Sequence, residues 1–233
     1  MKLKASSPFY SMDTRQMSNL FASSGALKFL WMKIRKKMPH HPKILSALGG
    51  VGEHIAVLKT IQPKAQFVQN DIDAQTCEHL RFRFPDICTC NVDVTKEEPQ
   101  PGKNYDLIIL DYHNFTLNRW GYWGPSLRLL GPHAPYLIIT ESACYGFAMG
   151  NLQKTYGVQT PKEYYDLLDK RCKRRIGKRV QAVVNYGGPA GGCALVLLGP
   201  IRGDTTPVKV DWNKHPVILP SDPLKVKKML RKF

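Results

Sequence analysis

Long apolar runs and acidic side chains are both scarce in this sequence of 233 residues. No stretch approaches the roughly 20 apolar residues of a membrane span, and the residues behind the basic start lack the apolar core of a secretory signal. The 18 Asp and Glu are outnumbered by 34 Lys and Arg, a formal net charge of +16. We therefore expect a soluble protein with a polyanionic partner; an anionic membrane surface and a merely basic solvated exterior are the alternatives.

Regularly spaced cysteines are absent as well. The usual gaps of structural zinc sites do not occur in the Cys77 to His79 or Cys88 to Cys90 segments, so no metal site is predicted. A chain of this length does not need covalent cross-links, and reduced thiols predict an intracellular, reducing compartment, with the cytoplasm favoured. The six cysteines are Cys77, Cys88, Cys90, Cys144, Cys172 and Cys193.

A glycine-rich turn within residues 43–53 organises the chain. An apolar run over residues 44–48 leads into Gly49, Gly50 and Gly52, and a segment of helical apolar periodicity follows. This order predicts a buried parallel strand, a tight turn and a helix. Glycine lets the backbone approach a bound molecule, and the first N–H groups of the helix point into the same space. The turn is a candidate ligand-binding loop; a tight turn with nothing bound is the alternative.

Acidic residues follow the next three predicted strands. Apolar segments at 65–68, 87–92 and 105–110 lead to Asp71, Asp93 and Asp111. Asp71 stands roughly 22 residues past the first glycine, where dinucleotide-binding folds carry a ribose-binding carboxylate. Because parallel strands end at one edge of the sheet, we expect the glycines and the three acids to border one crevice. Each acid taken singly could instead form a turn or cap a helix.

With these residues the sequence resembles the class I S-adenosylmethionine-dependent methyltransferases, over about residues 43–200. The resemblance implies that S-adenosylmethionine is the cofactor and that the glycine turn holds its amino-acid part. It also implies that Asp71 binds the ribose hydroxyls and Asp93 lies by the adenine. Ser46 departs from the family, which often has an acid within the first strand. The cofactor-binding residues that the resemblance implies are Gly49, Gly50, Gly52, Asp71, Asp93 and Asp111.

A basic helix is predicted over residues 17–38. Its segment 24–30 resembles the helix before the cofactor loop in FtsJ-like ribose 2′-O-methyltransferases, whose lysine lies at a similar distance from that loop. Those enzymes use a Lys-Asp-Lys-Glu tetrad, and the resemblance implies that Lys28 and Asp111 fill its first two places as catalytic residues.

The other two tetrad places are not filled by the expected residues. The fifth strand offers Thr140 or Glu141 instead of the second lysine, and the last strand offers Cys193 or Ala194 instead of the glutamate. Without a second lysine, deprotonation of a ribose hydroxyl has no obvious helper.

Aromatic residues gather after Asp111. We predict a substrate-facing loop that contains Trp120, Tyr122 and Trp123 and can stack on a base, with Asn114 as a catalytic residue that bonds an exocyclic group. Methyl transfer needs mainly an in-line nucleophile and a site without water, because the sulfonium is already activated. Core aromatics beneath a long loop are the alternative.

The densest basic cluster follows a helix start at Thr160 and Pro161, where threonine caps and proline is favoured at the first position. We predict that this cluster contacts nucleic-acid phosphates. Its members are Lys170, Arg171, Lys173, Arg174, Arg175, Lys178 and Arg179.

The predicted fold is a single α/β domain with a seven-stranded, mostly parallel, doubly wound sheet and an antiparallel last strand. Segments 180–186 and 193–198 form the closing antiparallel pair across a glycine-rich turn. The predicted organisation is a loop and basic helix at 1–42, an S-adenosylmethionine-binding, methyltransferase-like domain at 43–200, and a basic, proline-containing tail at 201–233.

The sequence thus predicts an S-adenosylmethionine-dependent methyltransferase that acts on nucleic acid, with RNA favoured over DNA. A catalytically inactive, methyltransferase-like protein that binds RNA or serves assembly is one alternative. A nicotinamide-dependent oxidoreductase is the other, and it is disfavoured because Ile55 stands where the third glycine of a G-x-G-x-x-G motif would be needed.

Overall fold

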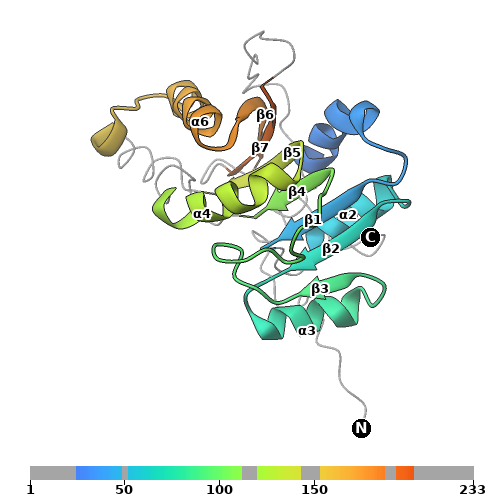
Figure 1. Cartoon of the computed structure of the whole chain (residues 1–233). Helices are drawn as coiled ribbons and strands as arrows, with labels where there is room; N and C mark the ends of the chain where they lie inside the picture. The colour runs from blue at the N-terminus through green and yellow to red at the C-terminus, as the bar shows by residue number, and fades with distance from the viewer. Residues whose placement is uncertain (1–24, 49–51, 112–119, 143–152, 187–192, 202–233) are drawn as a thin grey trace, which may run out of the picture.

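The computed structural model describes residues 25–48, 52–111, 120–142, 153–186 and 193–201. Its centre is a seven-stranded sheet in the order β3-β2-β1-β4-β5-β7-β6 (Figure 1). Strands β1 to β5 pair in parallel, and β7 runs antiparallel to both β5 and β6, which confirms the predicted fold class. The strands are β1 (Lys43–Ala47), β2 (Gln66–Asn70), β3 (Cys88–Cys90), β4 (Leu107–Leu110), β5 (Tyr136–Ser142), β6 (Lys178–Tyr186) and β7 (Cys193–Pro200).

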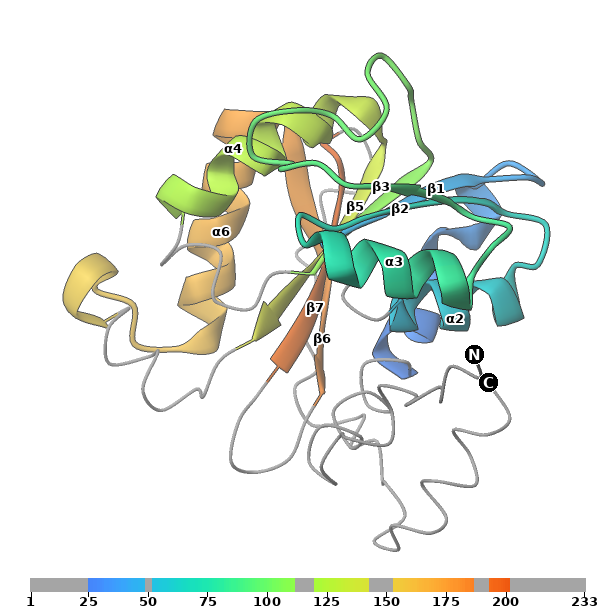
Figure 2. The same ribbon diagram turned by 90° about the horizontal axis from the view of Figure 1, so that it is seen from below.

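Helices cover both faces of the sheet. Figure 2 shows α4 and α6 on one face and α2 and α3 on the other. A helix over residues 25–34 lies on the α2 face and continues as the 3-10 helix η2 (Arg35–Lys37). The remaining helices are α2 (Glu53–Ile61), α3 (Ala74–Arg83), α4 (Trp120–Leu130), the 3-10 helix η3 (Gly131–His133) and α6 (Pro161–Ile176).

The central strands are apolar because they are buried on both faces. All four residues of β4 are buried, as are four of the five in β1. Alternate residues enter different cores: Ile108 and Leu110 pack with Leu127 and Leu168 from α4 and α6. On the other face, Ile109 packs with residues of α2 and of the helix over 25–34.

The helix over residues 25–34 belongs to the same core as the sheet. Leu27, Leu30 and Ile34 are almost fully buried and cluster with Ile109 and Ile138 of β4 and β5. The predicted boundary at residue 42 is therefore not a boundary between hydrophobic cores, because the segments on its two sides share one core. Within the predicted basic helix, only residues from 25 onward lie in the described part.

One helix begins within the predicted aromatic loop. The loop was predicted to contain Trp120, Tyr122 and Trp123, but α4 begins at Trp120 and contains Pro125. Proline normally interrupts a helix interior because it lacks an N–H donor. Here tertiary contacts stabilise the helix, since Ser126 and Leu127 are fully buried and Trp120 stacks against Arg171 of α6. The expectation that Trp120 and Trp123 lie in a loop is wrong.

The two edges of the sheet have different surroundings. The carboxyl edge is formed by the ends of β1 to β5, where the connections to α2, α3 and α4 begin. At the opposite, amino edge, Lys178 of β6 donates a hydrogen bond to Ala134 O just before β5. A Cβ on Gly131 would lie 3.5 Å from Ile176 Cβ, so the last turns of α4 and α6 meet at this edge.

Among the described helices, none has the length and apolar character required to cross a lipid bilayer.

Candidate functional site

The polar residues predicted from strand ends lie at the carboxyl edge of neighbouring strands. Asp71 directly follows β2, Asp111 directly follows β4, and Asp93 lies three residues past the end of β3. The strand between β2 and β4 is β1, which leads to the glycine turn. Gly49 and Gly50 lie outside the described residues. The edge where ligands of open α/β sheets bind therefore carries the predicted acids.

Gly52 begins α2 and has a backbone requirement of its own. Its φ is +82°, in the left-handed region that glycine adopts without strain. A Cβ at this position would lie 2.6 Å from the Phe84 ring and 2.9 Å from Leu80 Cδ2. Packing against α3 and the turn conformation both account for this glycine without a ligand.

Backbone hydrogen bonds hold Asp71 in place at the end of β2. Its N–H donates to Cys90 O at 3.4 Å, and its carbonyl accepts a hydrogen bond from Asn91 Nδ2 at 2.9 Å. The carboxylate Oδ1 accepts the N–H of Asp73 at 3.0 Å. These contacts fix the position of the carboxylate at the edge.

Asp93 has local hydrogen bonds to both carboxylate oxygens. Oδ1 accepts from the N–H and hydroxyl of Thr95, and Oδ2 pairs with Lys96 Nζ at 3.1 Å. The hydroxyl of Thr95 is the main cause of a lowered pKa for this carboxyl, and its N–H and Lys96 add to it. Asp93 therefore forms a local turn, which is the alternative given above for each acid taken singly.

Asp111 lies between polar side chains of two elements, β5 and α2. Thr140 of β5 donates its hydroxyl to Oδ1 at 2.5 Å, and His54 Nδ1 of α2 lies 4.0 Å from Oδ2. The Asp111 side chain is 27% exposed, whereas that of His54 is 7% exposed. The carboxylate is thus oriented from the protein side and still open to a ligand.

Two polar residues at this edge were not among the site residues predicted from the sequence. His54 and Ser46 are 5% and 1% exposed, and neither His54 Nδ1 nor Ser46 Oγ has a hydrogen-bond partner among the residues described. A buried polar atom without a partner costs about 1–3 kcal/mol, so such atoms call for an explanation. The only sequence signal for His54 was its place immediately after the glycine turn.

The tetrad expected from the FtsJ-like resemblance is not assembled around Asp111. Lys28 is exposed on the helix over 25–34 and is not among the Asp111 partners in the described chain. Of the two alternatives on β5, Thr140 contacts Asp111, whereas Glu141 accepts a hydrogen bond from Tyr164 of α6 on the other face. Asn114, Tyr122 and Cys193 have side chains outside the described part.

The predicted basic cluster extends toward the amino edge, away from the predicted acids. Residues 170–175 occupy the second half of α6, whose last residue, Ile176, meets Gly131 at the amino edge, and Lys178 and Arg179 begin β6. Lys170, Arg174 and Arg175 are exposed and have no ion-pair partner among the described residues.

The other cations of this cluster are held by the protein. Arg171 lies over the rings of Trp120 and Tyr156, 5.2 and 5.6 Å from their centroids, and Lys173 pairs with Asp169 at 2.5 Å. Arg179 is half-buried.

Lys178 differs from the prediction. It is 8% exposed, and its Nζ donates to Ala134 O at 2.6 Å, so its ammonium is not available to a phosphate. Burial lowers its pKa. We do not retain Lys178 as a phosphate contact.

Comparison with known proteins identifies the fold. No protein-family model and no curated protein sequence matches the chain. Magnesium protoporphyrin IX methyltransferase from Synechocystis, solved with bound S-adenosylmethionine, superposes with a TM-score of 0.56 at 14% identity, over 81% of this chain and 85% of that one. The N-methyltransferase NodS from Bradyrhizobium japonicum gives a TM-score of 0.53 at 12% identity, over 78% and 98% of the two chains.

A third similar structure is a Pyrococcus horikoshii protein that is provisionally named an RNA methyltransferase. Its TM-score is 0.55 at 11% identity, over 76% of this chain and 83% of that one. At these identities the likeness concerns the backbone and not the acceptor. The chain has the Rossmann-like fold of S-adenosylmethionine-dependent methyltransferases.

Proposed function

We propose that this protein is an S-adenosylmethionine-dependent methyltransferase whose cofactor binds at the carboxyl edge of the sheet. The observation that carries the proposal is the convergence of Asp71, Asp111 and Gly52, the N-cap of α2, at the carboxyl ends of neighbouring strands of this fold. The half-buried Asp111 carboxylate is also oriented by the Thr140 hydroxyl.

The residues at this edge fit the cofactor in kind. S-adenosylmethionine carries ribose hydroxyls, an ammonium and a carboxylate, and when bound it supplies an activated methyl group. Asp71 offers an acceptor for ribose hydroxyls. The unpartnered Ser46 Oγ and His54 Nδ1 are buried polar atoms on the α2 side of the same edge, which a polar ligand group would satisfy.

Asp111 is the residue we expect to act on the acceptor. Its Oδ1 is occupied by the Thr140 hydroxyl, so Oδ2 remains for the N–H or O–H group that receives the methyl. A carboxylate in this position holds the nucleophile in line and accepts its proton as the new bond forms. Asn114 and Lys28 stay predicted catalytic residues. Asp93 stays a predicted neighbour of the adenine, in addition to its hydrogen bonds within the turn.

We infer that the acceptor is a nucleic acid, and RNA in preference to DNA. The support is the formal charge of +16, the exposed cations Lys170, Arg174 and Arg175, and the likeness to a protein provisionally named an RNA methyltransferase. The free thiols of Cys77, Cys88, Cys90 and Cys172 agree with a reducing compartment.

Two measurements test this function. Calorimetric titration with S-adenosylhomocysteine should show binding in wild type and at least tenfold weaker binding in Asp71→Ala, with NAD as the comparison ligand. Transfer of a tritiated methyl group to total RNA and total DNA, followed by nucleoside analysis, then identifies the acceptor. Cofactor binding without transfer would favour the inactive RNA-binding alternative, and NAD binding alone would favour the oxidoreductase.

A further inference from the structure

We propose that the amino edge of the sheet is a second nucleic-acid contact, a phosphate-binding surface remote from the crevice at the carboxyl edge. The proposal rests on the nucleic-acid part of the proposed function and adds where the polymer is held. The cations of this surface are all exposed and come from η2, α4 and α6. We call them the amino-edge surface; they are Arg35, Lys36, Lys37, Arg128, Arg174 and Arg175.

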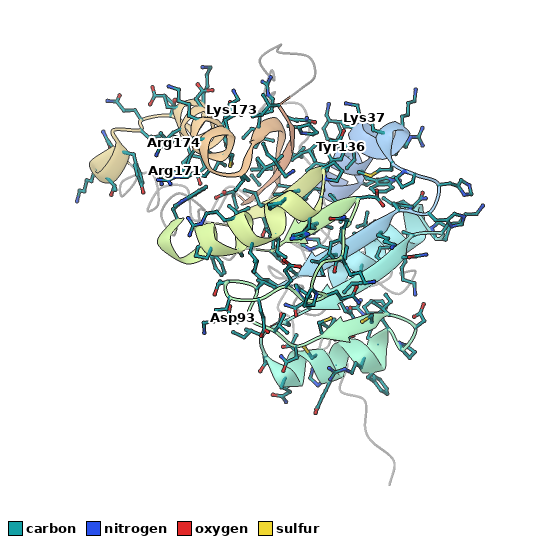
Figure 3. All side chains as sticks on the ribbon, viewed as in Figure 1. Lys37, Asp93, Tyr136, Arg171, Lys173 and Arg174 are labelled. Carbon is teal, nitrogen blue, oxygen red and sulfur yellow. The ribbon has the colours of Figure 1, made fainter. Side chains whose placement is uncertain are left out.

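Three elements bring these cations to one edge. Met38, directly after η2, packs into the core cluster that contains Tyr136, the first residue of β5. On the other face, the end of α6 leads into β6, where Lys178 bonds Ala134, two residues before Tyr136. Figure 3 shows Lys37, Tyr136, Lys173 and Arg174 in the upper part of the view, well separated from Asp93.

The positive charge of the amino-edge surface is not neutralised by the acids around it. Asp169 is engaged by Lys173 and by the N–H of Val180. Asp86, just before β3, pairs with Lys59. Asp106 and Glu98 also lie at this edge and keep their negative charge: Asp106 accepts the N–H of Lys43, and Glu98 accepts from His133 and from the N–H of Gly102. The six cations of the amino-edge surface outnumber these acids. Three further exposed lysines extend the positive area at the starts of neighbouring strands: Lys43, Lys64 and Lys103.

Distance and screening separate this surface from the crevice. The seven residues of β5 span roughly 20 Å between the two edges. The Debye length is about 8 Å at physiological salt, so these cations do not attract a substrate to the crevice across that distance. The carboxyl edge itself carries Asp71, Asp93 and Asp111, which repel phosphates. The cations therefore act by direct contact at their own edge.

The chemistry of the surface suits a phosphate backbone better than a membrane. Four of the six members are arginines, whose guanidinium groups bind phosphate with two parallel hydrogen bonds. Membrane-surface helices insert Trp, Phe or Leu beside their cations. Among the described residues, the large exposed apolar side chains are Met32, Ile72, Phe82 and Ile201. Ile201 follows the end of β7 at the amino edge, whereas η2 consists of cations alone.

Substrate length follows from this arrangement. A strand that contacts the amino-edge surface and also reaches the crevice must cover roughly 20 Å, about six nucleotides at 3.4 Å each, beyond the acceptor. An oligonucleotide shorter than this cannot contact the crevice and the amino-edge surface at the same time.

The test compares two variants with equal charge. Lys37→Gln/Arg174→Gln/Arg175→Gln removes three cations of the amino-edge surface. The control, Arg81→Gln/Lys154→Gln/Lys162→Gln, removes three exposed cations elsewhere. Fluorescence anisotropy measures binding of labelled single-stranded RNA of 6 and 20 nucleotides between 50 and 200 mM salt. Circular dichroism checks the fold.

We expect the first variant to bind the 20-nucleotide RNA at least tenfold more weakly and with a salt slope shallower by about 2, while the control stays within twofold of wild type. Equal losses in both variants would overturn the proposal, as would wild-type binding to phosphatidylserine vesicles but not to RNA. S-adenosylhomocysteine titration of the same proteins reports on the crevice alone, so a failed methyltransferase function is distinguished from a failed surface.

Discussion

The Thr140 hydroxyl lies 2.5 Å from Asp111 Oδ1 and joins the ends of β5 and β4 at the carboxyl edge. Hydrogen bonds to a charged group contribute about 1.5–3 kcal/mol, so this contact has a strong effect on which way the carboxylate faces. The other carboxylate oxygen, Oδ2, faces His54, whose Nδ1 lies 4.0 Å away.

Removal of the Thr140 hydroxyl should slow methyl transfer without loss of cofactor affinity. We expect Thr140→Val to lower the single-turnover rate about 10- to 100-fold, because Asp111 loses its orienting donor. Calorimetry with S-adenosylhomocysteine should give an unchanged affinity. Thr140→Ser keeps the hydroxyl and is the matched control; a rate as low as that of the valine variant would contradict the role.

Gly52 offers a test of the turn that leads into α2. Gly52→Ala places a methyl group 2.6 Å from the Phe84 ring at a φ of +82°, and we expect it to lower the free energy of unfolding by about 2–4 kcal/mol. Gly102 has a φ of +69° but nothing within 4 Å of its Cβ position, so Gly102→Ala should cost only about 1 kcal/mol. Urea unfolding measures both; equal losses would show that packing against α3 is unimportant.

Acid should weaken the turn that Asp93 forms. Hydrogen bonds from Thr95, and the pairing with Lys96, lower the pKa of this carboxyl below 3.8 in the folded state. Its stabilising effect is therefore complete above the unfolded-state pKa and is lost as the pH falls through the folded-state pKa. We expect urea unfolding between pH 7 and pH 2.5 to show a shallower acid loss in Asp93→Asn than in wild type. Parallel curves would mean that the carboxylate contacts do not persist in solution.

Thiol reactivity should follow burial along the chain. Burial raises the pKa of Cys172 to about 12, whereas Cys88 is exposed on β3. Iodoacetamide at pH 8 should modify Cys88 within minutes and Cys172 only after denaturation, because the thiolate is the reactive form. Peptide mass spectrometry reads each site separately. Rapid labelling of Cys172 in the folded protein would contradict its place between α6 and the sheet.

Local patterns predicted most of the strands. The runs at 65–68, 87–92 and 105–110 correspond to β2, β3 and β4 with shifts of one or a few residues at their ends. Apolar runs are reliable here because parallel strands in a doubly wound sheet are buried on both faces. The extent of α4 was not predictable in this way, since Gly121, Gly124 and Pro125 all disfavour helix and only packing overrides them.

The capping box of α6 was also predictable. Thr160 accepts the N–H of Glu163, and the Glu163 carboxylate accepts the N–H of Thr160, as the residue types at this spacing require. The basic residues of α6 were also identified from the sequence, but which of their side chains face solvent was not. A run of cations along a helix does not say which of them face solvent, nor that Lys178 turns inward to cap Ala134.

The sequence by itself determined the succession of strands and helices and the polar residues at strand ends, because periodicity, glycine and capping residues act over a few neighbours. Only the tertiary structure decided that Thr140 and not Glu141 meets Asp111, since alternate residues of a strand face opposite sides and packing selects the side. It likewise decided that Asp71 and Asp111 lie at the edge opposite the amino-edge surface, because that follows from how strands and helices are ordered in space.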